Sequence, residues 1–213
     1  MIKILVVDDN SFITGGLEII MSTMEDIEVL GAAQNGEEAV AFCQANEVDV
    51  VLMDVRMPVM DGVEATKRIT ETTRTKVIIL TTFDDDTSIL KAIENGAKGY
   101  LLKNNDPQII RHTIVSVMQN QSIIQEEIWD KVKSSLGKES EPDLSRLQLT
   151  ARELDVMKAV ASGLSNKEIA KNLFISEGTV ANNISALLGK LGLDHRTQLA
   201  ILYLTGHVGG GER

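Results

Sequence analysis

The sequence predicts an α/β domain built on a five-stranded parallel sheet, followed by a small all-α domain. The first 120 residues alternate short, β-branched apolar runs with longer segments of helical period, a pattern typical of a parallel sheet covered by helices on both faces. From about residue 148 onward only helical segments follow, and Ser or Thr caps mark the starts of the first three. A length of 213 residues suits two domains of ordinary size.

Five apolar runs are the expected strands of the first domain, and each precedes a segment of helical period. The expected strands cover residues 2–7, 27–33, 48–53, 76–82 and 99–103. The expected helices lie near residues 12–23, 36–45, 62–71, 86–95 and 106–120. The last helix has a readable start, because Asp106 can cap it and Pro107 fits the first turn, where a missing N–H costs nothing.

Three Ser or Thr residues mark the starts of the first three helices of the second domain. Thr150 and Glu153 have the spacing in which a cap hydroxyl and a carboxylate satisfy each other's backbone amides. Ser165 and Glu168 repeat this spacing, and Ser176 starts a third helix. The expected helices lie near residues 151–162, 166–173, 177–190 and 195–205. Short turns between short capped helices are typical of a helix-turn-helix.

A linker with a helical start is predicted at 121–147, because the stretch GKESEPDLS has the composition of a linker. It separates a first domain at 1–120 from a second at 148–208. Residues 1–125 carry 10 Lys+Arg against 19 Asp+Glu, whereas residues 150–213 carry 7 against 6. The net charge of −10 therefore belongs mainly to the first domain, and the near-neutral second domain permits DNA binding.

The expected location is the cytoplasm. No apolar run approaches the roughly 20 residues that cross a bilayer. The N-terminal MIKILVVDDN also puts two carboxylates where a signal peptide needs an apolar stretch. Cys43 is the only cysteine, so no intramolecular disulfide can form, and we expect it to be a small core residue.

Five polar side chains of different chemistry stand where the expected strands end. These are Asp8 and Asp9 after the first strand, Asp54 at the end of the third, Thr81 at the end of the fourth, and Lys103 at the end of the fifth. In a parallel sheet, side chains at the carboxyl ends of the strands face a common crevice. We therefore expect all five to meet in one site.

Three carboxylates brought together repel one another unless a cation lies among them. Mg²⁺ prefers oxygen ligands and keeps some waters, which suits carboxylates plus a phosphoryl group, so we predict a Mg²⁺ cofactor at Asp8, Asp9 and Asp54. Asp54 can then be the nucleophile that forms an acyl phosphate, and Lys103 supplies a second cation. Thr81 offers a hydroxyl that can turn toward a new phosphate oxygen.

These residues and their neighbours carry a family resemblance over roughly residues 1–120. They are Asp8, Asp9, Asp54, Met57, Pro58, Asp61, Gly62, Thr81 and Lys103. In order and spacing they resemble the receiver domain of two-component response regulators, a flavodoxin-like domain of five βα units. The resemblance implies that Asp54 accepts phosphate from a sensor histidine kinase, and that the backbone carbonyl of Arg56 joins the metal ligands. It also implies that Thr81 and Lys103 bind the phosphoryl group and that Tyr100 moves with Thr81. Simple packing at the sheet edge is the alternative for Tyr100.

A second set of residues lies within 149–200. They are Leu149, Thr150, Arg152, Glu153, Gly163, Ser165, Asn166, Lys167, Glu168, Ile169, Ala170, Ser176, Thr179, Val180, Lys190, Leu191, Arg196 and Ala200. They resemble the LuxR-type helix-turn-helix of the NarL/FixJ group of regulators. By analogy, the helix near 177–190 is the recognition helix, which enters the major groove of DNA. The DNA contacts expected from this resemblance are Lys167, Thr179, Asn182, Asn183, Lys190 and Arg196.

The recognition helix departs from the group at two positions. The group usually has Lys after Thr-Val, and often His two residues further on, where this sequence has Ala181 and Asn183. Asn can still read adenine, but an uncharged face attracts phosphate less, so a monomer should bind DNA weakly. For Lys190 and Arg196 the alternative role is an ion pair within the domain, and Asn182 and Asn183 are alternatively solvated helix residues.

The sequence therefore predicts a phosphorylation-controlled, DNA-binding transcriptional regulator of a bacterial-type two-component system. It is expected to accept and slowly lose its own phosphoryl group, without turnover as an enzyme. The predicted partners are a sensor histidine kinase, double-stranded promoter DNA and, after phosphorylation, a second copy of the chain. Leu199, Leu202 and Tyr203 are either a dimer surface, by analogy with the family, or core. Two alternative functions stay open: an aspartyl-phosphate phosphatase, and a regulator that acts through protein contacts.

Overall fold

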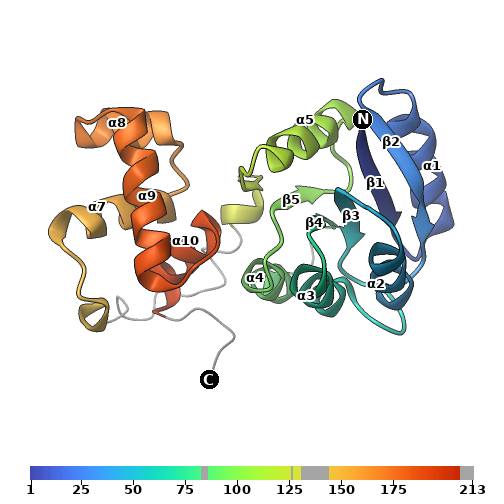
Figure 1. Ribbon diagram of the computed structural model, residues 1–213, viewed down its shortest axis with the longest axis horizontal. Helices are drawn as coiled ribbons and strands as arrows, with labels where there is room; N and C mark the ends of the chain where they lie inside the picture. Colours follow the sequence, from blue (N-terminus) through green and yellow to red (C-terminus); the bar gives the residue numbers. More distant parts are fainter. Residues whose placement is uncertain (83–85, 126, 131–143, 207–213) are drawn as a thin grey trace. The chain divides into compact units, whose positions relative to one another are not determined.

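The structure, a computed structural model, describes residues 1–82, 86–125, 127–130 and 144–206. The chain divides into two compact units, Met1–Ile128 and Trp129–Arg213. The first unit is an α/β domain and the second is helical (Figure 1), which confirms the predicted fold class. Residues 131–143, which belong to the predicted linker, lie outside the described residues.

A parallel sheet forms the middle layer of the first unit. Its strands are β1 (Ile2–Val7), β2 (Ile27–Ala33), β3 (Val50–Asp54), β4 (Lys76–Thr81), β5 (Gly99–Leu102) and β6 (Ile123–Ile124). They lie in the order β2-β1-β3-β4-β5-β6, and every neighbouring pair is parallel. The prediction of five strands is wrong by one, because the chain after the last helix of this unit pairs with the outer edge of β5.

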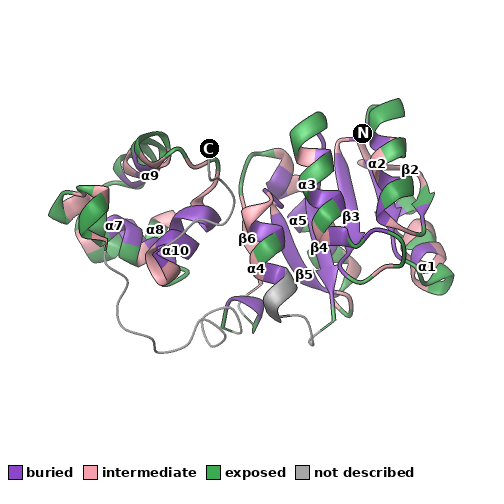
Figure 2. Ribbon diagram, turned by 90° about the horizontal axis from the view of Figure 1, so that it is seen from below, coloured by how far each residue is buried: buried purple, intermediate pink, exposed green. Residues whose placement is uncertain are grey.

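Helices cover both faces of this sheet. They are α1 (Ser11–Ser22), α2 (Gly36–Ala45), α3 (Gly62–Thr72), α4 (Asp86–Glu94) and α5 (Pro107–Met118). Apolar side chains of α1 and α5, such as Met21 and Ile114, share one core with Ile4 and Leu52 of the sheet. The other three helices line the opposite face (Figure 1). The central strands are buried on both sides (Figure 2), which explains why they read as continuous apolar runs.

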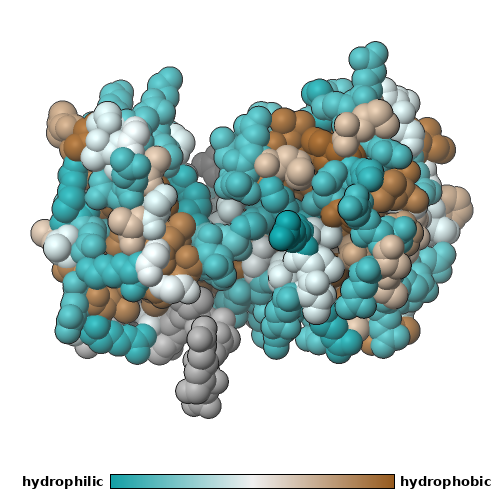
Figure 3. Space-filling model, in the orientation of Figure 1, coloured by the Kyte–Doolittle hydropathy of each residue, from teal (hydrophilic) through white to brown (hydrophobic). Residues whose placement is uncertain are grey.

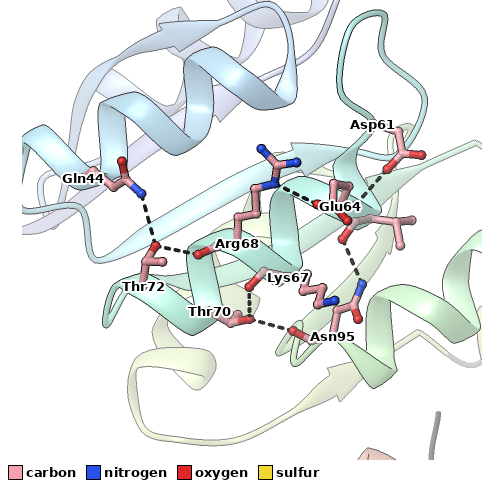
Figure 4. Close-up of polar contacts among 9 residues, drawn as sticks. Gln44, Asp61, Glu64, Lys67, Arg68, Thr70, Thr72 and Asn95 are labelled. Atoms are coloured by element: carbon pink, nitrogen blue, oxygen red, sulfur yellow. Dashed lines mark hydrogen bonds and ion pairs between the residues drawn. The ribbon is translucent and has the colours of Figure 1, made fainter. Parts of the chain in front are cut away.

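Hydrogen bonds fasten α3 at its start and to its neighbour α4 (Figure 4). Asp61 caps the helix, since its Oδ1 accepts from the backbone N–H of Glu64 at 2.8 Å. Thr70 Oγ1 donates to the carbonyl of Asn95 at 2.8 Å, and Asn95 Nδ2 donates to the carbonyl of Val63 at 3.0 Å. Because Asn95 directly follows α4, these bonds hold the two helices side by side.

The described part of the second unit is helical. Its elements are η1 (Ser145–Leu147), α7 (Ala151–Ala161), α8 (Asn166–Leu173), α9 (Glu177–Leu191) and α10 (Arg196–Thr205). The capping boxes predicted at Thr150 and Ser165 are both present, which confirms the starts of α7 and α8. On α9, Leu187 is buried and Leu188 is half-buried.

Within the described residues, no helix is both long and apolar enough to cross a bilayer. The 15 residues of α9 fall short of the roughly 20 that a membrane span needs. Hydrophilic and hydrophobic side chains are intermixed on the face of each unit that Figure 3 shows.

Candidate functional site

The predicted site residues of the first unit lie at the carboxyl ends of its strands. Asp8 directly follows β1, Asp54 is the last residue of β3, and Lys103 directly follows β5. The Lys103 ammonium group lies 2.7 Å from Asp8 Oδ2 and 2.8 Å from Asp54 Oδ1. Parallel pairing of the strands therefore brings together three charged groups that are far apart in the sequence.

Three carboxylates gather around this point. The nearest ligand oxygens of Asp8, Asp9 and Asp54 all lie within 4.8 Å of one another. Asp8 and Asp54 are buried, whereas Asp9 is exposed and opens the cluster to solvent. Arg56 and Asp9 both line an open cavity of about 460 Å³ beside the cluster. Oxygen donors of this kind fit a hard divalent cation such as Mg²⁺.

Burial and charge act against each other at the centre of the site. Burial raises the pKa of Asp54 above its usual value, although the hydrogen bond from Lys103 opposes that shift. Burial also acts to lower the pKa of Lys103, but its bonds to Asp54 and Asp8 outweigh this effect and leave the pKa raised. Lys103 therefore stays positively charged beside the candidate nucleophile.

The backbone carbonyl group of Asp54 leaves no room for a side chain at position 62, which is a glycine. A Cβ atom at this position would lie 1.9 Å from the carbonyl oxygen of Asp54. The N–H of Gly62 donates to the carbonyl of Val55 at 2.9 Å, and the N–H of Val55 donates to Asp54 Oδ1 at 2.7 Å. The Asp61-Gly62 pair thus serves packing and helix capping, and it positions the loop that follows Asp54.

The two predicted switch residues are buried on neighbouring strands. Thr81 is 1% exposed, and its hydroxyl donates to the carbonyl of Thr82 at 2.9 Å. Tyr100 is fully buried, its hydroxyl donates to the carbonyl of Ala97 at 3.3 Å, and burial raises its pKa well above the usual value. Full burial fits both roles weighed for Tyr100, the switch and simple packing near the sheet edge.

The predicted base-reading residues at the start of the recognition helix, α9, are uncharged. Thr179, Ala181 and Asn182 are exposed near its start. Asn183 is half-buried, and its Nδ2 donates to the carbonyl of Thr179 at 2.8 Å. Lys167 is exposed near the start of α8. Lys167, Thr179, Asn182 and Asn183, four of the predicted DNA contacts, are therefore accessible at least in part.

The other two predicted DNA contacts bond inside the second unit. Lys190 Nζ lies 2.8 Å from Glu153 Oε2 and 3.0 Å from the carbonyl of Gln148. The ion pair with Lys190 holds the pKa of Glu153 at about 2. The Arg196 guanidinium donates to the carbonyl of Leu164 at 2.7 Å and to Asn166 Oδ1 at 3.2 Å, and burial lowers its pKa. Lys190 thus forms the ion pair that was its alternative role, whereas Arg196 bonds to neutral oxygens of the same unit.

The last helix, α10, packs on α7. Leu199 and Leu202 are buried, and Tyr203 is half-buried. Of the two roles weighed for the leucines, burial favours the core over a dimer surface.

Both units are similar to known protein families. Residues 4–115 match the response regulator receiver domain, and residues 147–203 match the bacterial regulatory proteins of the luxR family. The transcriptional regulatory protein LnrK of Bacillus subtilis (strain 168) is 40% identical over 210 residues, covering 94% of this chain and 96% of LnrK. LiaR of the same strain is 38% identical over 209 residues, covering 98% of this chain and 99% of LiaR.

Solved structures show the same fold. The response regulator ChrA of a heme-sensing two-component system aligns with a TM-score of 0.57 at 31% identity, over 94% of each chain. The RcsB–DNA complex aligns with a TM-score of 0.57 at 18% identity, over 97% of this chain and 99% of that one.

Proposed function

We propose that this chain, which belongs to the two-component response regulators with a receiver domain and a LuxR-type DNA-binding domain, is switched by phosphorylation of Asp54. The observation that carries the proposal is the meeting of Asp54 with Asp8 and Lys103 at the end of the sheet. A carboxylate nucleophile beside a fixed cation suits phosphoryl transfer, in which catalysis rests on positioning and on electrostatic stabilisation.

In the proposed step, a carboxylate oxygen of Asp54 attacks the phosphorus of a phosphohistidine on a sensor kinase. The new O–P bond forms as the N–P bond breaks, and the electron pair of the broken bond stays on the imidazole, which takes up a proton. Lys103 exchanges its bond to Asp54 for one to a phosphoryl oxygen. Asp8, Asp9, Asp54 and the carbonyl of Arg56 would hold Mg²⁺, which when bound neutralises charge on the phosphoryl oxygens.

Hydrolysis of the acyl phosphate returns the Asp54 carboxylate and releases inorganic phosphate. The chain therefore processes its own phosphoryl group and no external substrate. Release of phosphate from a phosphomonoester in a colorimetric assay would instead support the phosphatase alternative.

Thr81 and Tyr100 would change conformation when Asp54 is phosphorylated. The Thr81 hydroxyl now donates to a neutral carbonyl, and a charged phosphoryl oxygen is a stronger acceptor. Thr81 would turn toward the phosphoryl group, and Tyr100 on the neighbouring strand would move with it. The receiver domain would exchange between two conformations, and phosphorylation of Asp54 would favour one of them.

In the second unit, α9 would enter the major groove of promoter DNA in the cytoplasm. Thr179, Asn182 and Asn183 are the candidates to read base edges, and Lys167 is the candidate to contact phosphate. An uncharged reading face makes the affinity of one copy low. Two copies paired by phosphorylation would bind two half-sites at once, which raises the affinity without any new contact.

The test combines mass spectrometry with DNA binding. Phosphoramidate and Mg²⁺ should add one phosphoryl group to the wild-type chain and none to Asp54→Ala. The treated wild type should then shift a DNA fragment selected by it from a random-sequence library, with an affinity that falls as salt rises. If phosphorylated protein shifts no fragment even at low salt, the second unit acts through protein contacts instead.

A further inference from the structure

The chain that follows α5 returns to the edge of the sheet and pairs with the first half of β5 (Figure 2). Ile123 and Ile124 form β6, opposite Gly99 and Tyr100 of β5. The N–H of Ile123 donates to the carbonyl of Lys98 at 2.9 Å, and the N–H of Gln125 donates to the carbonyl of Tyr100 at 3.1 Å. The first residues beyond α5 are thus bonded to the strand that leads to Lys103.

The side chain of Gln125 continues this pairing where the backbone of β6 ends. Its Oε1 accepts from the N–H of Leu102 at 3.1 Å and from Asn105 Nδ2 at 2.6 Å. Asn105 Nδ2 also donates to the carbonyl of Leu102 at 2.8 Å. Gln125 therefore takes the place of a further strand residue, and it closes the turn that begins at Lys103.

These bonds fix the backbone from which Lys103 projects. On the inner side of β5, the N–H of Lys103 donates to the carbonyl of Thr81 at 2.8 Å. On the outer side, the N–H of Leu102 has the Gln125 side chain as its acceptor. Without that acceptor a partly buried N–H would lose its partner, and the end of β5 would be held from one side only. The ammonium group of Lys103 needs a fixed backbone to meet two carboxylates at once.

We propose that Gln125 is a positioning residue for phosphorylation, which holds the end of β5 so that Lys103 meets Asp8 and Asp54. Because Gln125 begins the connection to the DNA-binding domain, it also ties that connection to the site. The proposal rests on the proposed role of Asp54 as phosphoacceptor. It differs from a purely structural role, because it makes the rate of phosphoryl transfer depend on one acceptor atom.

Three variants of the full chain separate these roles. Gln125→Leu keeps the size of the side chain and removes the acceptor. Gln125→Glu keeps an oxygen that can accept from both Leu102 and Asn105. Gln121→Leu makes the same change at an exposed position of the same segment and is the matched control. Acyl phosphate formation from phosphoramidate, exchange of the Leu102 amide hydrogen by NMR, and thermal unfolding are measured for each.

Gln125→Leu should form the acyl phosphate about fivefold more slowly and exchange the Leu102 amide about fivefold faster, the effect of losing roughly one hydrogen bond. Gln125→Glu should restore both rates, and Gln121→Leu should match the wild type. If Gln125→Leu does not fold, Asn105→Ala, which removes the second partner of the same oxygen, should slow phosphorylation in the same direction.

The proposal is overturned if Gln125→Leu, or Asn105→Ala in its place, unfolds at a lower temperature but takes up phosphate at the wild-type rate. It is also overturned if Gln125→Glu is as slow as Gln125→Leu. A wild-type chain that takes up no phosphoryl group would overturn the proposed function itself, and this inference with it. The wild-type control therefore tells the two failures apart.

Discussion

Cationic side chains that the sequence offers as phosphate contacts have different partners in the two units. In the first unit, the Lys103 side chain is only 15% exposed, and it points at Asp8 and Asp54, where a phosphoryl group would arrive. In the second unit, Lys190 and Arg196 bond to groups of their own domain. Positive charge in a sequence therefore does not mark a phosphate contact until the partner of that charge is known.

The two sites also depend on the fold to different degrees. The first is assembled from the ends of several strands, so its geometry relies on long-range pairing. The residues proposed to contact DNA lie mainly on α9, with Lys167 on the neighbouring helix. Substitutions should therefore disturb the first site through packing and the second through surface chemistry.

Gly62→Ala should have the largest effect, because the added Cβ would overlap the carbonyl oxygen of Asp54. We expect the first unit to lose about 3 kcal/mol of unfolding free energy, measured by urea denaturation. The matched control in the second unit is Gly189→Ala in α9, where nothing lies within 4 Å of the added atom. This control should gain about 0.5–1 kcal/mol. If both substitutions changed the unfolding free energy by the same amount, the difference in packing between the two glycine positions would be contradicted.

Lys103→Met should have the next largest effect. It leaves Asp8 and Asp54 buried without their cation, which should cost about 2–3 kcal/mol in urea denaturation without Mg²⁺. Added Mg²⁺ should recover part of this loss, since the same carboxylates would hold it. Lys190→Met breaks a more exposed pair, so it should cost no more than about 1 kcal/mol, with no effect of Mg²⁺. A similar response of both variants to Mg²⁺ would contradict the assignment of the metal site.

Arg196→Met and Lys167→Met test the division of roles within the second unit. Arg196→Met removes bonds to Leu164 and Asn166, so it should lower the unfolding free energy by about 1–2 kcal/mol. The salt dependence of DNA binding should stay unchanged. Lys167→Met should leave stability unchanged and reduce the slope of log affinity against log salt by about 1. The reverse pattern would make Arg196 the phosphate contact.

Acid should weaken the second unit through Glu153. Its pKa of about 2 in the folded state lies below the usual 4.5, mainly because of the hydrogen bond from Lys190. The stabilising contribution is therefore complete above pH 4.5 and is lost as the pH falls to about 2. Glu153→Gln and Lys190→Met should both flatten this part of the curve of unfolding free energy against pH. A curve unchanged by either substitution would rule out the ion pair as its cause.

Local signals explain which parts of the fold could be predicted from the sequence. The capping boxes at Thr150 and Ser165 involve residues three positions apart, so their spacing is visible in the sequence. The apolar runs of β1, β3, β4 and β5 reflect burial on both faces of the sheet. The strand β6 could not be predicted, because two residues form it only when the edge of β5 is there to pair with.

The same distinction between local and long-range signals explains which features of the candidate sites could be predicted. The meeting of Asp54 with Lys103 could be predicted, because parallel topology fixes where strand ends meet. The partners of Lys190 lie on distant parts of the chain, and no periodicity points to them.

Sedimentation velocity of the full chain tests most directly whether phosphorylation at Asp54 controls pairing of two copies. With phosphoramidate and Mg²⁺, the wild type should change from monomer to dimer, and Asp54→Ala should stay a monomer under the same conditions. A dimer of treated Asp54→Ala, or a phosphorylated wild type that stays monomeric, would contradict this control.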